Sequence, residues 1–243
     1  MRLAILGFLA LLPISEGPVA AADNAMSLVL GFSPDGRTFS FEEYGVQDGS
    51  GFPYSSIYVI DTATDQWVGG TPIRVLSEDE TTSLESVRGD ALDKARPILT
   101  SRHVDEPGSV LASNPITEAS ADPHFVSFRT RDYSLPTSEK PYELRLDEVA
   151  LPAPDCPDMD LGQPFQGFRL TLTDPDGKPH VLQDDQQLPK SRRCPLSYGI
   201  SEVDIFFPPA GQPVLVVLVN VFSYGFEGYD RRFLAVTGPL PAS

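Results

Sequence analysis

The stretch from Leu28 to Asp61 places the strongest constraint on the fold, because it contains two strand-like runs joined by the turn Ser33-Pro34-Asp35-Gly36. Pro34 presets φ at the second turn position, and Gly36 suits the left-handed position that closes a three-residue hairpin loop. A glycine-rich loop and a third run, Ser56 to Asp61, follow. The stretch therefore predicts an antiparallel hairpin followed by a further strand.

A two-residue alternation of apolar and polar side chains returns at His124 and persists to the end of the chain. Such alternation is typical of half-buried antiparallel strands. The run from Val214 to Phe222 is apolar on both faces apart from Asn220, which predicts a strand in the centre of a sheet. Trp67 to Val75 is expected to continue the sheet, with Gly69-Gly70 as a bulge or turn. The remaining strands are expected at Val126–Phe128, Tyr142–Leu146, Phe168–Leu172, His180–Leu182 (after a second turn, Asp174-Pro175-Asp176-Gly177), Val203–Phe207 and Arg232–Thr237.

One segment has helical rather than strand periodicity. Apolar residues recur at helical spacing from Leu84 to Ile98, which predicts an amphipathic helix from about Ser83 to Arg102. Thr82 and Glu85 have the spacing of a capping box, and Pro97 is expected to kink or end the helix. The following segment, Glu106 to Pro123, shows no periodicity and is predicted to be a loop.

These patterns predict a mainly β protein, an antiparallel sandwich or open barrel with one packed α-helix. Roughly 220 residues fit one large all-β domain or two small ones. Of these, we expect residues 23–243 to form a single mostly-β domain with a helical insertion at about residues 83–102. The 24 prolines also favour short strands joined by ordered turns. The alternative is a partial or irregular β-propeller, although the two PDG turns are irregularly spaced for its blades.

Two resemblances accompany these patterns. The sequence FSPDGR, followed by an aromatic strand, a loop and IYVID, resembles one blade of the WD40-like propellers found in the periplasmic partner of the Tol system. Taken whole, and with the C-terminal GFEGYDRRFLAVTG, the chain resembles a family of bacterial predicted secreted proteins of no assigned function. The second resemblance covers most of the chain after its N-terminal segment and implies export, but no activity and no site residues.

The N-terminal segment, Met1 to Ala22, has the pattern of a secretory signal peptide. Arg2 supplies the positive charge, Leu3 to Leu12 is apolar, and Val19-Ala20-Ala21 or Ala20-Ala21-Ala22 offers small residues for cleavage. Ten apolar residues are too few to span about 30 Å of hydrocarbon. We therefore expect a periplasmic or secreted protein without membrane insertion after cleavage.

Export makes a disulfide between Cys156 and Cys194 the expected state of the two cysteines, because oxidising compartments keep such pairs closed. His103, His124 and His180 lack metal-ligand spacing, and no GxSxG motif is present. The acidic run with Asp155, Asp158, Asp160 and Gly162 lacks the ligand spacing of a calcium loop. We therefore predict no metal, no cofactor and no catalytic residue, and leave open whether the protein is an enzyme.

The formal net charge of −16 disfavours binding to nucleic acids or anionic lipids. Aromatic residues and arginine, the types enriched at recognition surfaces, gather in two glycine-containing segments. We therefore expect a non-catalytic binding or cell-envelope-associated module whose partner is a protein or envelope component; the alternative is a hydrolase acting on a cell-envelope substrate. The predicted binding residues are Phe52, Tyr54, Tyr224, Phe226, Tyr229, Arg231 and Arg232.

Overall fold

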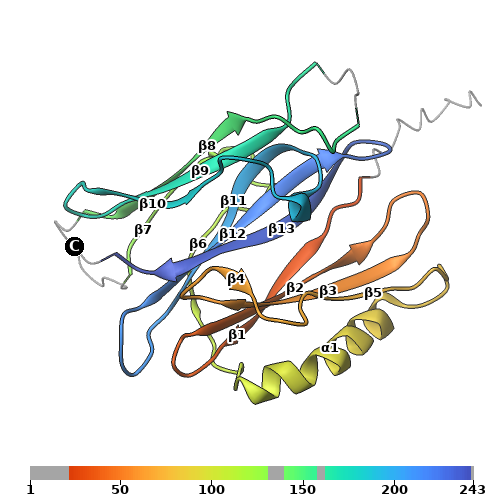
Figure 1. The fold of residues 1–243 in the computed structure, drawn as a ribbon, viewed down its shortest axis with the longest axis horizontal. Helices are drawn as coiled ribbons and strands as arrows, with labels where there is room; N and C mark the ends of the chain where they lie inside the picture. The colour runs from red at the N-terminus through yellow and green to blue at the C-terminus, as the bar shows by residue number, and fades with distance from the viewer. Residues whose placement is uncertain (1–21, 131–139, 158–161, 242–243) are drawn as a thin grey trace, which may run out of the picture.

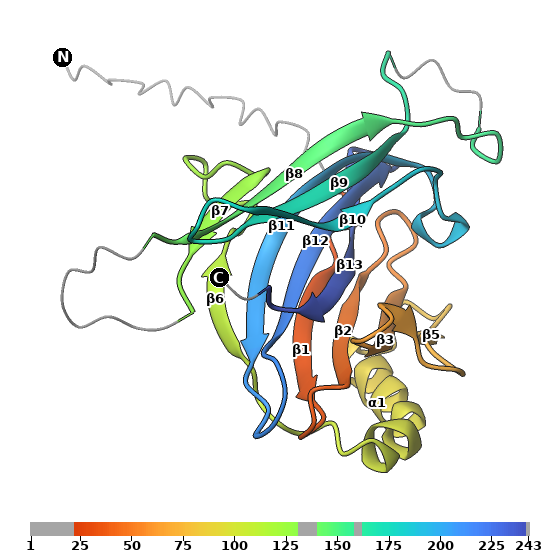
Figure 2. The same ribbon diagram turned by 60° about the vertical axis from the view of Figure 1, so that its left-hand side comes forward.

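A computed structural model describes residues 22–130, 140–157 and 162–241. In these ranges the chain forms three stacked antiparallel sheets with one α-helix on the outside (Figures 1 and 2). This arrangement confirms the predicted mainly β sandwich with one packed helix. No sheet of the described residues closes into a barrel, and the propeller blade is not confirmed.

The first sheet is built by the N-terminal third of the chain, in the order β1-β2-β3-β4 with β5 also paired to β3. It contains the predicted hairpin and the strand that follows. Its strands are β1 (Met26–Phe32), β2 (Thr38–Val46), β3 (Pro53–Asp61), β4 (Gln66–Trp67) and β5 (Ile73–Leu76).

The middle sheet has the order β13-β12-β11-β6, and the third sheet has the order β10-β9-β8-β7. The middle-sheet strands are β6 (Ser109–Ser113), β11 (Pro195–Phe206), β12 (Val214–Tyr224) and β13 (Tyr229–Pro239). The third-sheet strands are β7 (Phe125–Phe128), β8 (Tyr142–Ala150), β9 (Gln166–Thr173) and β10 (Pro179–Asp184). A short 3₁₀ turn, η1 (Lys190–Arg192), lies between β10 and β11. The predicted loop from Glu106 to Pro123 is wrong in part, because it contains β6.

β12 is buried on both faces because its sheet lies between the other two. Val217 and Val219 pack with the third sheet, whereas Val216 and Leu218 pack with the first sheet. The sequence pattern of this strand therefore confirms its predicted central place. A separate cluster that includes Ile57 and Val59 joins the opposite face of the first sheet to the helix.

The Ser33–Gly36 turn forms as predicted, but its loop is longer. The N–H of Gly36 donates to the Ser33 carbonyl at 2.8 Å, and Gly36 has φ 71°. Five residues, 33–37, connect β1 to β2, so the predicted three-residue loop is wrong. The longer loop is stabilised by side chains, because Ser33 Oγ accepts the Thr38 N–H at 2.9 Å and Asp35 Oδ1 accepts the Arg37 N–H at 3.1 Å.

The helix α1 (Leu84–Ser101) matches the predicted segment and differs at two points. Ser83 is the N-cap, with its side chain accepting the Ser86 N–H at 3.1 Å, so the capping box of Thr82 and Glu85 is not formed. Of the two outcomes expected at Pro97, an end of the helix there is wrong, because the helix continues for another turn. Packing of its small residues against the first sheet offsets the hydrogen bond that the proline ring removes.

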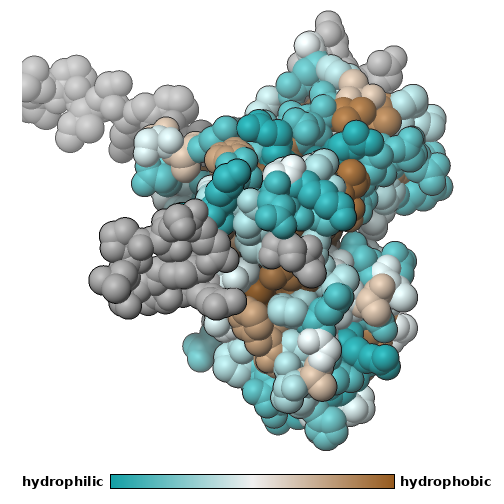
Figure 3. Space-filling view, turned by 90° about the vertical axis from the view of Figure 1, so that its left-hand side faces the viewer, coloured by the Kyte–Doolittle hydropathy of each residue, from teal (hydrophilic) through white to brown (hydrophobic). Residues whose placement is uncertain are grey.

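The disulfide between Cys156 and Cys194 is present, with Cα atoms 5.7 Å apart. It ties the segment after β8 to the start of β11. Of the acidic run beside it, Asp158 and Asp160 lie outside the described residues, as does the predicted signal peptide up to residue 21. No helix in the described part of the chain is long and apolar enough to cross a membrane. The face in Figure 3 is mostly hydrophilic, with hydrophobic colour confined to a few patches.

Candidate functional site

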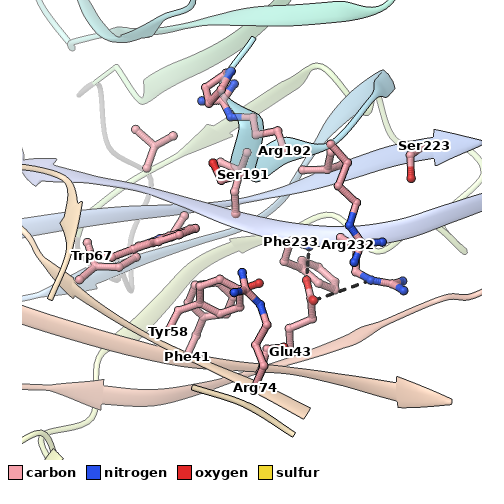
Figure 4. A pocket seen from close by; sticks show the side chains of 18 of the residues that line it. Phe41, Glu43, Tyr58, Trp67, Arg74, Ser191, Arg192, Ser223, Arg232 and Phe233 are labelled. Carbon is pink, nitrogen blue, oxygen red and sulfur yellow. Dashed lines mark hydrogen bonds and ion pairs between the residues drawn. The ribbon is translucent and has the colours of Figure 1, made fainter. Parts of the chain in front are cut away.

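A cleft of about 570 Å³ opens between the first sheet and the β13 edge of the middle sheet (Figure 4). Strands β2 to β5 line one wall of this inter-sheet cleft, and β12 and β13 line the other. The loop between β10 and β11 contributes Pro189, Ser191, Arg192 and Arg193. The volume of the cleft lies within the range of about 300–1,000 Å³ that is usual for small-molecule sites.

Aromatic rings line the first-sheet wall of the cleft. Phe41 stacks on Tyr58 with centroids 4.7 Å apart, and Tyr58 lies 5.9 Å from Trp67. Burial raises the pKa of Tyr58 to about 12, so its hydroxyl stays protonated at neutral pH. Trp67 is 44% exposed on the short strand β4 and offers an accessible ring at one end of the cleft. This wall can therefore contact a flat apolar group.

The opposite wall contains the free edge of β13, and carboxylates from the first sheet bind its N–H groups. Phe233 N–H donates to Glu43 Oε2 at 2.7 Å, and Thr237 N–H donates to Asp65 Oδ1 at 2.9 Å. Ala235 lies between Phe233 and Thr237 on β13. Because alternate N–H groups of a strand point to the same side, its N–H also points from the free edge of β13 into the cleft. These contacts connect two sheets whose strands do not pair and cover part of an exposed strand edge.

Burial is the main cause that raises the pKa of both carboxyl groups, Glu43 and Asp65, while their hydrogen bonds to β13 act in the opposite direction. Asp65 Oδ1 also accepts the hydroxyl of Thr237 at 2.8 Å. Because a main-chain N–H of β13 bonds one oxygen of each carboxylate, the geometry assigns both groups to holding the sheets together.

Arginine side chains supply the positive charge of the cleft. Arg74 projects from β5 beside Tyr58, with its guanidinium 5.9 Å from the Trp67 ring (Figure 4). Arg193 is exposed in the β10–β11 loop, next to the disulfide at Cys194, and has a left-handed φ of 59°. Arg192 forms an ion pair with Asp185, which fixes the base of this loop. The disulfide and the ion pair therefore hold Arg193 at the rim of the cleft.

Two predicted binding residues, Tyr54 and Arg232, meet inside the protein. Arg232 pairs with Asp23, lies 3.8 Å from Glu43 Oε1 and stacks 4.8 Å above the Tyr54 ring. Tyr54 is 7% exposed, and its hydroxyl donates to Asp23 Oδ1 at 2.9 Å. Both residues line the inner part of the cleft, where they serve mainly to connect sheets.

The other predicted residues lie near the surface. The β12–β13 hairpin exposes three aromatic residues: Tyr224 (54% exposed), Phe226 (83%) and Tyr229 (52%). Arg231 donates a hydrogen bond to the Ala25 carbonyl at 2.7 Å. Phe52 is half-buried in the loop before β3. Phe226 lines a small hollow of about 210 Å³, the end hollow, which also contains Asp48 of the β2–β3 loop. The end hollow and the cleft share Gln47, Arg193 and Arg232. The structure thus brings the β2–β3 and β12–β13 loops together at one end of the cleft.

Sequence reasoning missed the residues that give the cleft its chemistry: Phe41, Tyr58, Trp67, Arg74 and Arg193. They come from separate strands and a loop, and no spacing motif connects them. Among the described residues no group of three His, Cys, Asp or Glu side chains is placed to hold a metal ion. His180 instead bonds Asp174 at 2.8 Å, and His124 bonds the Tyr198 carbonyl at 3.0 Å.

Comparison with curated proteins found no match to this chain. A family model described as "Predicted secreted protein (DUF2259)" matches residues 40–239, which include the cleft-lining segments of all three sheets. This description agrees with the predicted export of the protein and with its resemblance to predicted secreted proteins. The chain belongs to the DUF2259 family of predicted secreted proteins.

Proposed function

We propose that this protein is an exported, non-catalytic binding module that holds a small organic anion in the inter-sheet cleft. The observation that carries the proposal is the convergence of Arg74 and Arg193 with the rings of Tyr58 and Trp67 on one cleft of about 570 Å³. Positive charge concentrated there in a chain of net charge −16 favours a negatively charged ligand.

The cleft matches a ligand with two chemical parts. A guanidinium binds carboxylate or phosphate groups through paired hydrogen bonds, and the N–H of Ala235 adds a main-chain donor nearby. Trp67 and Tyr58 offer flat apolar surface with polar tips. A cell-envelope component or other exported metabolite that carries an acidic group beside a ring fits both parts. The exposed aromatics at the β12–β13 hairpin extend the same surface beyond the cleft.

The alternative function, a hydrolase acting on a cell-envelope substrate, is less consistent with this geometry. Two carboxyl groups line the cleft, as a glycosidase requires. However, Glu43 and Asp65 accept hydrogen bonds from Phe233 and Thr237, and no histidine or cysteine is among the described residues that line the cleft. Turnover of an envelope polysaccharide or peptide by the purified protein, abolished in Glu43→Gln, would favour the hydrolase.

The test uses Trp67, the single tryptophan of the chain, as a reporter of the cleft. 8-Anilinonaphthalene-1-sulfonate combines an anionic group with aromatic rings, and its binding is followed by energy transfer from Trp67. Arg74→Gln should weaken binding about tenfold or more, because one hydrogen bond to a charged group contributes roughly 1.5–3 kcal/mol. The matched control is Arg145→Gln, which removes an exposed arginine that stacks on Phe125 in the third sheet.

The expected result is weaker dye binding in Arg74→Gln with an unchanged melting temperature, and wild-type binding in Arg145→Gln. Equal affinities in all three proteins would show that the dye binds elsewhere and would overturn the assignment of the cleft. The same assay, with candidate envelope anions as competitors of the dye, then identifies the natural ligand class.

A further inference from the structure

The end hollow contains more negative than positive charge. Its charged side chains are Asp23, Asp48 and Asp230 against Arg193 and Arg232. Oδ2 of Asp48 is buried and has no hydrogen-bond partner among the described residues. Burial is the main cause that raises the pKa of Asp230, and the negative charge of Asp23 raises it further. The hollow therefore lacks one positive charge.

The main-chain nitrogen of Asp23 lies at this hollow. It donates to Asp230 Oδ1 at 3.2 Å. The residue is 5% exposed and is fixed on its other sides, because its carbonyl accepts the Arg231 N–H at 2.9 Å and its carboxylate binds Arg232 and Tyr54. The position of this nitrogen is thus fixed by contacts of Asp23 with β13 and with Tyr54 of β3.

The sequence immediately before Asp23 is Ala20-Ala21-Ala22, one of the two small-residue patterns suited to signal cleavage. We propose that the signal peptide is removed after Ala22 and that the new α-ammonium group of Asp23 occupies the acidic hollow and pairs with Asp230. Hydrolysis of the Ala22–Asp23 bond by a signal peptidase consumes one water and leaves a carboxylate on Ala22 and an ammonium on Asp23. It replaces an uncharged amide donor with a positive charge at the same place.

This proposal does not rest on a ligand in the cleft, although the hollow shares Arg193 and Arg232 with the cleft. It sets an order of events. Because Asp23 is nearly inaccessible once docked, cleavage has to precede the packing of the N-terminus against β13. The added charge balances the hollow, which then contains three negative and three positive groups instead of three negative and two positive ones. Folding of the exported chain is thereby completed by its own processing.

The first test is the intact mass of the full-length protein after export. The mature chain is expected to begin at Asp23, and a chain that begins at Ala22 or retains the signal would overturn the proposal.

The second test measures the pKa of the α-ammonium by ¹³C NMR after reductive ¹³C-methylation of the exported protein, since a dimethylated amine still carries the charge. The pKa should lie about one unit or more above the usual 7.7–8.0, and should fall in Asp230→Asn or, if that variant does not fold, in Asp48→Asn. Asp90→Asn, which removes an exposed carboxylate from α1, is the control and should leave the pKa unchanged. A value in the usual range, or one insensitive to both substitutions in the hollow, would contradict the pairing.

Discussion

Replacing Asp204 by asparagine is expected to stabilise the protein at neutral pH. Asp204 is 2% exposed on β11, and strand alternation directs its side chain to the same face as Phe206, into the core between the middle and first sheets. Burial first, and the charge of Glu202 second, raise the pKa of Asp204 from 3.8 to about 8. At pH 7 this carboxyl is therefore protonated in the folded protein and ionised in the unfolded chain.

The size of the stability gain follows from the proton that Asp204 binds in the folded state but not in the unfolded chain at neutral pH. Between the two pKa values the stability falls by about 1.4 kcal/mol for each pH unit of increase, which amounts to about 3 kcal/mol between about pH 5 and pH 7. Asparagine has nearly the same volume and does not ionise. Asp204→Asn should therefore exceed the wild type by about 2–4 kcal/mol at pH 7 and by almost nothing near pH 4.

The assay is urea unfolding of the wild type, Asp204→Asn and the exposed-site control Asp90→Asn across this pH range. Other groups titrate in all three proteins, so the difference from the wild type reports Asp204 together with its neighbour Glu202, whose pKa burial also raises. The difference should widen steadily with pH for Asp204→Asn and stay near zero for Asp90→Asn. A difference that does not change between about pH 5 and pH 7 would refute the assignment of a buried, protonated Asp204.

Three further results are expected. Replacing both Cys156 and Cys194 by serine should cost about 3–4 kcal/mol in urea unfolding, because the bridge closes a loop across a sequence separation of 38 residues; a loss below about 1 kcal/mol would contradict this. Arg88→Ala should cost about 2–4 kcal/mol, since the buried Glu42 carboxylate loses the two hydrogen bonds of 2.7 and 2.9 Å that Arg88 donates and keeps the one from Ser55, whereas Arg88→Lys should restore part of the loss. Phe226→Ala should leave the melting temperature unchanged, because the ring is 83% exposed; a clear drop would mean that the ring belongs to the core.

The features that sequence predicted best depend on local chemistry. The turn at Ser33–Gly36 needs only a fixed proline φ and a glycine at positive φ, and both are visible in four letters. β12 was predictable because a strand that is apolar on both faces has to be covered on both. The extent of the helix was also predictable. Its N-cap is Ser83 and not the predicted Thr82, because these adjacent residues are both suitable caps.

The features that sequence did not predict depend on tertiary contacts. β6 lacks alternation because it is an edge strand that remains largely exposed, with Val110 57% exposed. The buried acid Glu43 resembles any surface carboxylate in the sequence, since its partner is the N–H of Phe233, 190 residues away. Trp67 and Arg74 meet only because β4 and β5 both pair with β3. A cleft between sheets has no linear motif.

The most direct test of the proposed binding cleft is collisional quenching of Trp67 fluorescence by iodide and by caesium in the absence of ligand. Trp67 is the only tryptophan and is exposed at the cleft, so the two ions report the local charge there. Positive charge at the cleft predicts stronger quenching by iodide than by caesium, despite the net charge of −16, and weaker iodide quenching in Arg74→Gln. Stronger quenching by caesium, unchanged by Arg74→Gln, would contradict an anion-binding cleft.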